Sequence, residues 1–520
     1  MSDSAMIVET ASGKIRGACG HGVSVFKGIP YGAPTSGVNR FRPPVAPEPW
    51  PGVRDAREFG NGCVQNLRMP PPGTPMYEVY ASVLGDDSWQ LQGEDCLVLN
   101  VWTPQTGDGS GKRPVMVWFH GGFFTQGSGS SRLFDGARLS RRGDTVIVTV
   151  NHRLNVFGFL HLADIDSRFA QSGNVGMLDL VAALEWVRDN IARFGGDPDN
   201  VTIFGESGGG AKVCTMLAMP SAEGLFHKAI IQSGASLRAN GRDEATRLAR
   251  LLLAELDLAE QDVGKLQNWD ARALLQAAVA AEAKTGKNIF DGSFGSWAPL
   301  VDGTSLPHHP FSPEAPPVSR SVPLMVGNTK DEVTMSLVSL PTFDSMTAED
   351  LRGMLVPVLR ESVDAAVTLY ERLHGHETPG YRLAILLADF LAHCPSALVA
   401  ERKAKQQGAA AYYYVLTWET PVLGGKLRSM HALDIPLVFD NVEMGGASLL
   451  GTGSEPQMLA DAMSSAWLAF ARNGNPDNPL IPHWPAYSEV DRAAMVFNVD
   501  SRVVSDYGGE ARRFWTPLRR

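Results

Sequence analysis

Short apolar runs of strand length recur through the centre of the chain. They are VMVWF (115–119), TVIVTV (145–150), VTIF (201–204), AIIQS (229–233), PLMVG (323–327) and YYYVL (412–416). Apolar residues occupy both faces of each run, which is typical of parallel strands that are covered on both sides. Helical patterns lie between the runs, so the chain predicts an α/β fold with a mostly parallel central sheet flanked by helices.

The clearest helical pattern covers residues 176–194. One apolar stripe runs along it, formed by Leu180, Leu184, Val187 and Ile191. Such a stripe packs on a sheet, and the glycine pair at 195–196 predicts the end of the helix. Two other stretches, at about 238–320 and 345–407, have helical patterns and little strand signal. We expect them to be lid-like insertions that form the pocket rim of a single catalytic domain spanning 1–520.

The first hundred residues differ from this centre because they are rich in proline and glycine. Segments such as GIPYGAP (28–34) and FRPPVAPEPWPG (41–52) favour turns and extended edges over helices. The run RMPPPGTP (68–75) predicts an exposed loop.

Composition excludes several classes of protein. The 520 residues include 46 Lys and Arg against 56 Asp and Glu, a net charge of −10, and 44% are hydrophobic. This balance predicts an ordered globular chain and argues against a nucleic-acid partner. No apolar run reaches about 18 residues, so we expect no membrane span.

Cysteine usage and the start of the chain add expectations about metal binding and localisation. The five cysteines are sparse and lack zinc-ligand spacing, so no zinc site is expected. We also expect neither another metal nor a cofactor. The N-terminus lacks the basic start and apolar stretch of a secretory signal, which predicts a cytoplasmic protein; a secreted form stays open. No pattern in the chain predicts the oligomeric state.

The sharpest motif is Gly205-Glu206-Ser207-Gly208-Gly209, which follows the run VTIF and precedes a helical pattern. A serine in a tight strand-to-helix turn adopts strained dihedrals, and small neighbours make room for that turn. The turn lifts the hydroxyl above the sheet and directs the next amide and the helix N-terminus at the same point. Ser207 is therefore the predicted nucleophile. The alternative interpretation of the motif is a glycine-rich helix cap with Ser207 as the N-cap residue.

A serine nucleophile needs a histidine base and a carboxylate, which follow it in the order acid, then histidine, on this fold. Asp331 and Glu332 directly follow PLMVG, expected to be the next-to-last strand, and spacing does not decide between them. His431 follows YYYVL by a short loop and precedes another apolar run. The other downstream candidates are His308, His309, His374, His376 and His483.

An oxyanion site is predicted where VMVWF ends in His120-Gly121-Gly122-Phe123-Phe124. A His-Gly-Gly turn after an early strand supplies flexible backbone, whose amides can face a later nucleophile. An ordinary turn is the alternative interpretation of the motif.

Taken together, the motifs resemble the type B carboxylesterases, the cholinesterase-like branch of the α/β-hydrolases. FGGDPDNVTIFGESGGG (194–210) is similar to the serine signature of that family, and EDCLVLNVWTP (94–104) is similar to its second signature. Other segments stand in the family's order from about residue 8 to beyond 500: GIPYGAP, FRPP, NHRLNVFGFL, WAPLVDG, GNTKDE and HALDIPLVF. The resemblance implies the α/β-hydrolase fold and hydrolysis of small-molecule carboxylic esters.

By position, the resemblance makes Ser207 the nucleophile, Glu332 the triad acid and His431 the general base. It decides between Asp331 and Glu332, which spacing alone leaves open. The implied oxyanion donors are the backbone amides of Gly122, Phe123 and Gly208.

The resemblance also implies supporting residues around this centre. Glu206 matches a buried acidic position, and residues around Phe294 and Trp297 match the wall of the acyl pocket. Phe123 stands where the family usually has a small residue, so its ring and that of Phe124 are expected to narrow the pocket. Cys63 and Cys96 match a family disulfide, although a cytosolic chain would keep both thiols reduced.

Two rival functions stay open at this point. The same triad could cleave an amide or a carbamate in place of an ester. A non-catalytic adhesion or binding module on the same scaffold is the remote alternative, since such relatives lack the serine or the histidine.

Overall fold

The computed structural model describes residues 6–20, 22–67, 69–84, 91–104, 111–287, 293–444 and 446–519. The strands are β1 (Met6–Thr10), β2 (Gly13–Gly20), β3 (Val23–Pro30), β4 (Val53–Asp55), β5 (Val98–Thr103), β6 (Arg113–Phe119), β7 (Val146–Val150), β8 (Gly196–Glu206), β9 (Lys228–Gln232), β10 (Leu324–Thr329), β11 (Ala411–Leu416), β12 (Ala493–Phe497) and β13 (Arg502–Ser505). The α-helices are α1 (Pro75–Leu84), α2 (Ala137–Gly143), α3 (Asn155–Phe159), α4 (Val175–Asn190), α5 (Gly208–Met216), α6 (Arg242–Glu255), α7 (Ala271–Ala283), α8 (Thr334–Leu337), α9 (Ala348–Leu359), α10 (Val363–His374), α11 (Pro379–Ala388), α12 (Cys394–Lys405), α13 (Asp434–Val438), α14 (Ala447–Leu450), α15 (Glu455–Asn473) and α16 (Gly509–Trp515).

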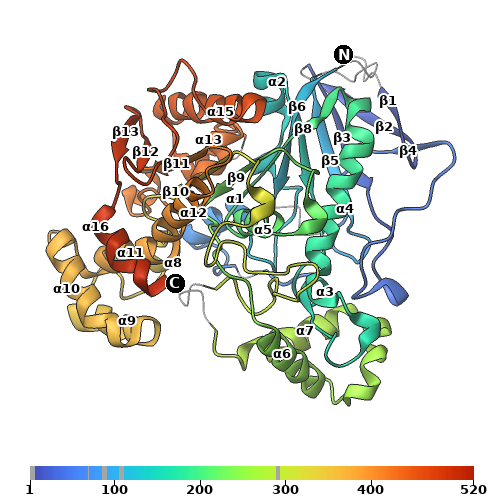
Figure 1. Cartoon of the computed structure of the whole chain (residues 1–520), viewed down its shortest axis with the longest axis horizontal. Helices are drawn as coiled ribbons and strands as arrows, with labels where there is room; N and C mark the ends of the chain where they lie inside the picture. The colour runs from blue at the N-terminus through green and yellow to red at the C-terminus, as the bar shows by residue number, and fades with distance from the viewer. Residues whose placement is uncertain are drawn as a thin grey trace.

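One large sheet contains all of the strands in the described part of the chain. Its order is β1-β2-β3-β5-β7-β6-β8-β9-β10-β11-β12-β13, with β4 paired beside β2. The pairs from β7 through β12 are parallel, and the pairs at both ends of the order are antiparallel (Figure 1). The six apolar runs are the core of this parallel section, which confirms the predicted α/β-hydrolase architecture.

The uniformly apolar runs are explained by two separate hydrophobic layers. In β6, Val115 and Val117 belong to the core on one face of the sheet, whereas Met116 and Trp118 belong to the core on the other. Helix α4 covers the first face and α15 the second (Figure 1). Since successive strand residues point to opposite faces, a strand between two helical layers must be apolar throughout.

The edges of the sheet depart from the predicted pattern. PLMVG is not part of the next-to-last strand, because β11, β12 and β13 all follow β10 along the chain. The strands β12 and β13 were missed because they are short, and β13 is partly exposed and polar at its ends. Helix α1 begins at Pro75 within a segment where proline predicts loops, since proline is tolerated in the first turn of a helix.

Helices are present in both of the stretches that have helical patterns. Helices α6 and α7 pack together within 238–320, of which residues 288–292 lie outside the described part. Helices α9 to α12 fill 345–407, and a π-helical turn at Asp389–His393 joins α11 to α12 (Figure 1). Within the described residues, only the segment Pro379–Lys405 has the length and apolarity of a membrane span, and 83% of its most apolar window is buried inside the protein.

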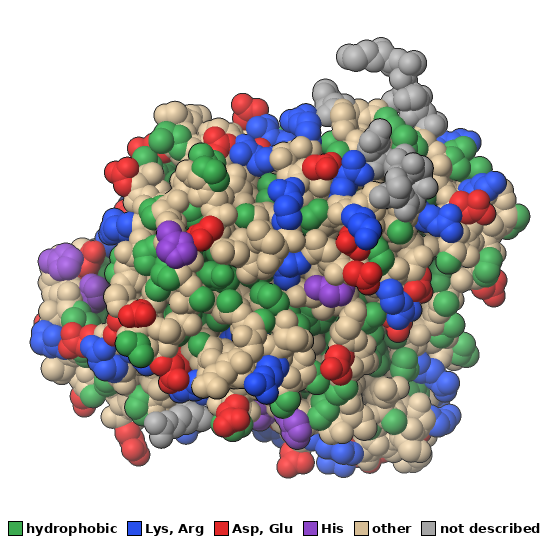
Figure 2. Space-filling model, turned by 45° about the horizontal axis from the view of Figure 1, so that its top comes forward, with side chains coloured by type: hydrophobic (Ala, Val, Ile, Leu, Met, Phe, Trp, Pro, Cys, Tyr) green, Lys and Arg blue, Asp and Glu red, His purple; other side chains and the backbone are tan. Residues whose placement is uncertain are grey.

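Charged side chains are mixed on the surface. On the face in Figure 2, basic and acidic side chains alternate with apolar and neutral ones over the whole outline. Ion pairs such as Arg188 with Asp189, whose side chains are both 52% exposed, are typical of this surface.

A buried ion pair connects the loop after β7 to helix α4. Arg153 and Asp179 are 2% and 0% exposed and form a two-pronged pair, with the shorter N–O distance at 2.6 Å. The remaining terminal nitrogen of Arg153 donates to the carbonyl oxygen of Arg42 at 2.7 Å. All sides of the guanidinium are therefore engaged, and α4 is held at a fixed position against the sheet.

Replacing one partner of this pair should be strongly destabilising. We expect Asp179→Asn to lower the free energy of unfolding by about 3–5 kcal/mol, because it leaves the buried Arg153 charge uncompensated. Urea unfolding followed by circular dichroism measures the change. The exposed pair supplies the control: Asp189→Asn should stay within about 0.5 kcal/mol of the parent. Equal effects of the two substitutions would contradict the stabilising role that we assign to the buried pair.

Candidate active site

The predicted nucleophile lies on a strained turn between β8 and α5. Ser207 has φ 59° and ψ −124°, in the left-handed region, and its amide donates to the carbonyl of Gln232 in β9 at 2.8 Å. A Cβ atom at Gly205 would lie 2.6 Å from the carbonyl oxygen of Phe119, and one at Gly209 only 2.0 Å from it. Glycine is thus required at both positions, as the motif predicts.

The predicted acid, Glu332, lies just beyond the carboxyl end of β10. Glu332 accepts the backbone N–H of Thr329 at 2.8 Å through one oxygen, and its other oxygen is hydrogen bonded to Nδ1 of His431. A backbone bridge brings the two segments together, since the amide of Asp331 donates to the carbonyl of Ser429 at 2.9 Å. The Asp331 carboxylate accepts the amide of Ser429 at 3.2 Å instead, so it faces away from the imidazole.

Ser207 and His431 line the same cavity, but their side chains are not hydrogen bonded to each other in the described structure. Nε2 of His431 lies 3.2 Å from Oε1 of Glu206, the residue just before the nucleophile. The attraction between a buried carboxylate and the imidazole accounts for this orientation. Among the described histidines, only His120 and His431 line the cavity, so the other downstream candidates are excluded from it.

Two buried carboxylates determine the charge of His431. Burial lowers the pKa of the imidazole, but Glu206 and Glu332 outweigh burial and raise the pKa above its usual value. Burial raises the pKa of Glu206, which the positive imidazole only partly offsets. For Glu332, burial works against ionisation, yet the charge and hydrogen bond of His431 bring its pKa below the usual value. Of the two carboxylates, Glu332 is therefore the one whose pKa is shifted toward the charged form.

The predicted oxyanion loop lies directly beside the nucleophile. Gly122 has φ 83° and Phe123 φ 56°, so both backbone units are in the left-handed region. A Cβ atom at Gly121 would lie 3.4 Å from Cβ of Ser207, and one at Gly208 would lie 2.1 Å from the carbonyl oxygen of Phe123. The loop and the turn after β8 approach so closely that only glycine fits between them.

The cavity beside Ser207 has a volume of about 590 Å³ and a largely apolar wall. Among the described residues that line it, only Tyr80, His120, Glu206 and His431 are charged or titratable. The apolar wall is formed by Met69, Pro70, Pro71, Tyr80, Val83, Phe123, Phe134, Met335 and Ile435. Tyr80 and Val83 belong to α1, the helix that the sequence pattern missed. Among the described residues, no group of three or more His, Cys, Asp and Glu side chains is arranged to hold a metal ion.

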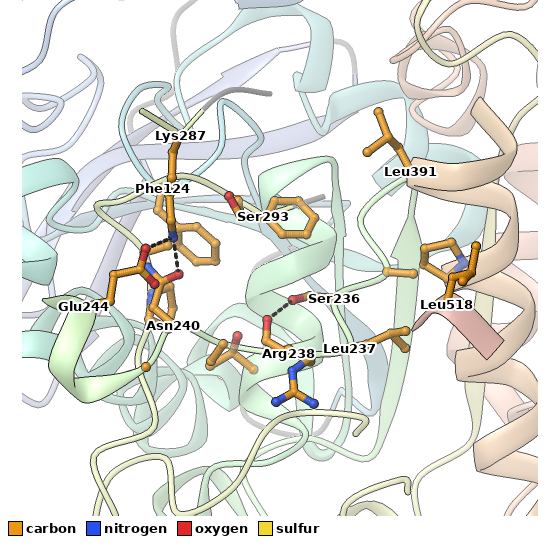
Figure 3. A pocket seen from close by; sticks show the side chains of 18 residues that line it. Phe124, Ser236, Leu237, Arg238, Asn240, Glu244, Lys287, Ser293, Leu391 and Leu518 are labelled. Carbon is orange, nitrogen blue, oxygen red and sulfur yellow. Dashed lines mark hydrogen bonds and ion pairs between the residues drawn. The ribbon is translucent and has the colours of Figure 1, made fainter. Parts of the chain in front are cut away.

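The aromatic residues expected at the pocket wall lie elsewhere. Phe124 and Phe294 do not line the cavity beside Ser207; they line a second cavity of about 340 Å³ (Figure 3). The Phe294 ring packs against Phe123 and Phe124 with centroid distances of 6.4 and 6.3 Å, so it forms a layer behind Phe123. Trp297 lines neither cavity, and its indole N–H donates to the carbonyl of Ala278 at 3.4 Å.

Part of the lining of the second cavity is polar. Lys287 forms an ion pair with Glu244 and donates to the side-chain oxygen of Asn240, so its charge is neutralised there (Figure 3). This arrangement differs from the apolar wall beside Ser207.

Comparisons with known proteins show which family the chain belongs to. The sequence profile of the carboxylesterase family matches residues 4–515. The chain belongs to this family. It is 36% identical to a para-nitrobenzyl esterase of Bacillus subtilis (strain 168), covering 99% of both chains, and 31% identical to a phenmedipham hydrolase of Pseudarthrobacter oxydans, covering 98% of this chain and 96% of that one. A solved carboxylesterase of Geobacillus stearothermophilus superposes with a TM-score of 0.83 at 36% identity, covering 98% of this chain and 99% of that one. The protein is a carboxylic ester hydrolase of the serine type.

The cysteines of the suggested family disulfide carry free thiols in this esterase. Cys63 and Cys96 are both buried, and the neighbouring Cys63 thiol, together with burial, raises the pKa of Cys96 well above its usual value. The Cys63 sulfur also accepts the backbone N–H of Leu154 at 3.3 Å. The two residues are thus neighbours, as the resemblance implies, and the bond between them is not formed.

Removal of the Glu206 charge should change how the esterase responds to pH. Because Glu206 raises the pKa of His431, Glu206→Gln lowers that pKa, and the unprotonated base persists to lower pH. We expect the acidic limb of the kcat/KM profile to move down by about one pH unit. Asp331→Asn is the matched control, since that buried carboxylate faces away from the imidazole. An acidic limb that stays in place in Glu206→Gln would contradict this account.

Proposed function

We propose that Ser207, His431 and Glu332 are the catalytic triad of this esterase, and that hydrolysis passes through an acyl-enzyme. The convergence of the Glu332–His431 hydrogen bond and the strained Ser207 turn on one cavity carries the proposal. His431 takes the hydroxyl proton as Ser207 Oγ attacks the ester carbonyl. The carbonyl oxygen becomes an oxyanion, and His431 then protonates the departing alcohol. Water repeats the two steps and releases the acid.

Glu332 holds the imidazole in one tautomer during these steps. Its hydrogen bond to Nδ1 leaves Nε2 as the nitrogen that exchanges the proton with Ser207. Nε2 must turn from Glu206 toward the hydroxyl for the reaction to begin, and catalytic hydrogen bonds commonly tighten only when substrate is bound. A Glu206 that takes up a proton, as its raised pKa favours, releases the imidazole for that movement.

The proposed oxyanion donors are the backbone amides of Gly122, Phe123 and Gly208. Gly208 begins α5, so the partial positive charge of a helix N-terminus adds to its amide. Amides held in a fixed direction need no reorganisation when charge develops, which is the largest single contribution in many hydrolases.

We further propose that the substrates are neutral esters with an apolar alcohol or acyl group. The apolar wall and the volume of about 590 Å³ support this class, since burial of apolar surface would supply most of the binding free energy. The rival that uses the same groups is cleavage of an amide or a carbamate. A non-catalytic binding role is disfavoured because no member of the proposed triad is missing.

Replacement of the nucleophile should abolish hydrolysis without unfolding the protein. We expect Ser207→Ala to lower kcat on an activated aryl ester by roughly 10⁴–10⁶-fold, because no covalent intermediate can form. Circular dichroism and the melting temperature serve as controls for folding. A fluorophosphonate should label the parent at Ser207, detected by mass spectrometry. Retained activity in the variant, or an unlabelled parent, would contradict the proposed triad.

The nature of the cleaved bond is tested with matched substrates. An apolar alkyl or aryl ester should exceed the anilide with the same acyl group in kcat/KM by at least 10²-fold, because an amine leaving group depends far more on protonation than an alcohol does. Steady-state kinetics on the pair measures the ratio. A larger kcat/KM for the anilide or for a matched carbamate would favour the rival function.

A further inference from the structure

A buried lysine lies directly beneath the oxyanion loop. Lys212 is in α5, five residues after Ser207, and its side chain is completely excluded from solvent. Its ammonium donates to the carbonyl oxygens of His120 and Phe123, both at 2.9 Å. It also lies 5.2 Å from the centroid of the Phe124 ring. The lysine therefore spans the loop, with one hydrogen bond at each end of the segment that contains the proposed oxyanion donors.

The carbonyls between these two ends are held as well. The carbonyl oxygen of Gly121 is 2.8 Å from Nδ1 of His120, and that of Gly122 accepts the amides of Thr125 and Gln126 at 3.3 and 3.1 Å. A peptide unit whose carbonyl is bonded on one side directs its N–H to the other. The amides of Gly122 and Phe123 belong to these two peptide units, so their directions are set by the bonds that hold the opposite carbonyls.

His120 donates through Nδ1 in this arrangement, because the Gly121 carbonyl that it faces can only accept. Burial, followed by the charge of Lys212, lowers the pKa of His120 to about 3. A neutral imidazole that faces a carbonyl through Nδ1 must carry its hydrogen there, since a carbonyl only accepts. Lys212 acts on the loop through the backbone carbonyls of His120 and Phe123.

Packing alone does not account for a lysine at this position. A completely buried ammonium loses its hydration, and an apolar side chain of similar volume would fill the same space without that cost. Burial lowers the pKa of Lys212 to about 7, which the charge of Glu206 partly offsets. Both the ammonium and the neutral amine have enough N–H groups to reach the two carbonyls, so the contact persists on either side of that pKa.

We propose that Lys212 is a positioning residue for ester hydrolysis, and that it holds the His120–Phe123 loop so that the amides of Gly122 and Phe123 point at the oxyanion. The inference rests on the proposed function, because it takes the oxyanion donors from there. The lysine touches neither the substrate nor the nucleophile; it acts through the backbone between them.

The chain contains a matched control for this role. Lys403 in α12 is likewise buried and donates to two backbone carbonyls, those of Ser319 and Arg320. Burial lowers its pKa to about 8. It does not line the cavity beside Ser207. Removal of either ammonium deprives two carbonyls of a donor, but only Lys212 is connected to the oxyanion loop.

The test compares Lys212→Met with Lys403→Met, with the concentration of active enzyme determined from the burst of alcohol released by an aryl ester. We expect kcat per active site to fall by roughly 10- to 100-fold in Lys212→Met, approaching the loss of one oxyanion donor, with KM changed less than about threefold. Lys403→Met should keep kcat within about threefold of the parent. If Lys212→Met does not fold, Lys212→Gln takes its place in the same comparison.

A second measurement separates positioning from a general loss of order. An alkyl trifluoromethyl ketone adds to the serine hydroxyl and forms a stable oxyanion, whereas the matching alkyl ether is bound without reaction. In the Lys212 variant, the inhibition constant of the ketone should rise by the same factor as kcat falls, and that of the ether should not change.

Three results would overturn the inference. The first is a Lys212 variant whose kcat and ketone inhibition remain within threefold of the parent. The second is a fall in kcat without a parallel change for the ketone, and the third is an equal loss in Lys403→Met. Failure of the proposed function has a different signature, since Ser207→Ala would then retain activity whatever the Lys212 variants do.

Discussion

The closeness of two backbone segments at the carboxyl edge of the sheet is the constraint on which the rest of the site depends. The turn after β8 and the loop after β6 meet with no room for a Cβ atom at Gly208 or Gly209. Each segment leaves a strand of one parallel pair, so the sheet itself sets their separation. The strain of a left-handed serine is stable there because hydrogen bonds to β9 and into α5 hold the turn from both sides.

Much of this arrangement could be predicted because it follows from local pattern. The six central strands are apolar on both faces, because a strand between two helical layers buries the side chains of both faces. The Ser207 turn could be predicted for a similar reason, since neighbouring backbone lies so close to its glycines that no other residue fits there. Helix α1 was missed because it begins in a proline-rich run, and the strands β12 and β13 were missed because they are short.

The side chains around the nucleophile were harder to derive. Spacing does not separate Asp331 from Glu332; the bridge between Asp331 and Ser429 does, because it turns one carboxylate toward the backbone and the other toward His431. The positions of Phe124 and Phe294 behind Phe123 depend on how three rings pack, which a motif does not encode. Lys212 follows the segment that resembles the family's serine signature (194–210) by two residues, yet a lysine in a helix normally indicates a solvated face.

The order of the strands has a consequence for how the protein is made. The oxyanion loop is translated first, the serine second, the carboxylate third and the imidazole last, each after a different strand. A ribosome must therefore extrude the polypeptide beyond residue 431 before the complete group of side chains can assemble. Nascent chains that end between residues 207 and 431 carry Ser207 without the imidazole, so the proposed triad is incomplete until the last part of synthesis.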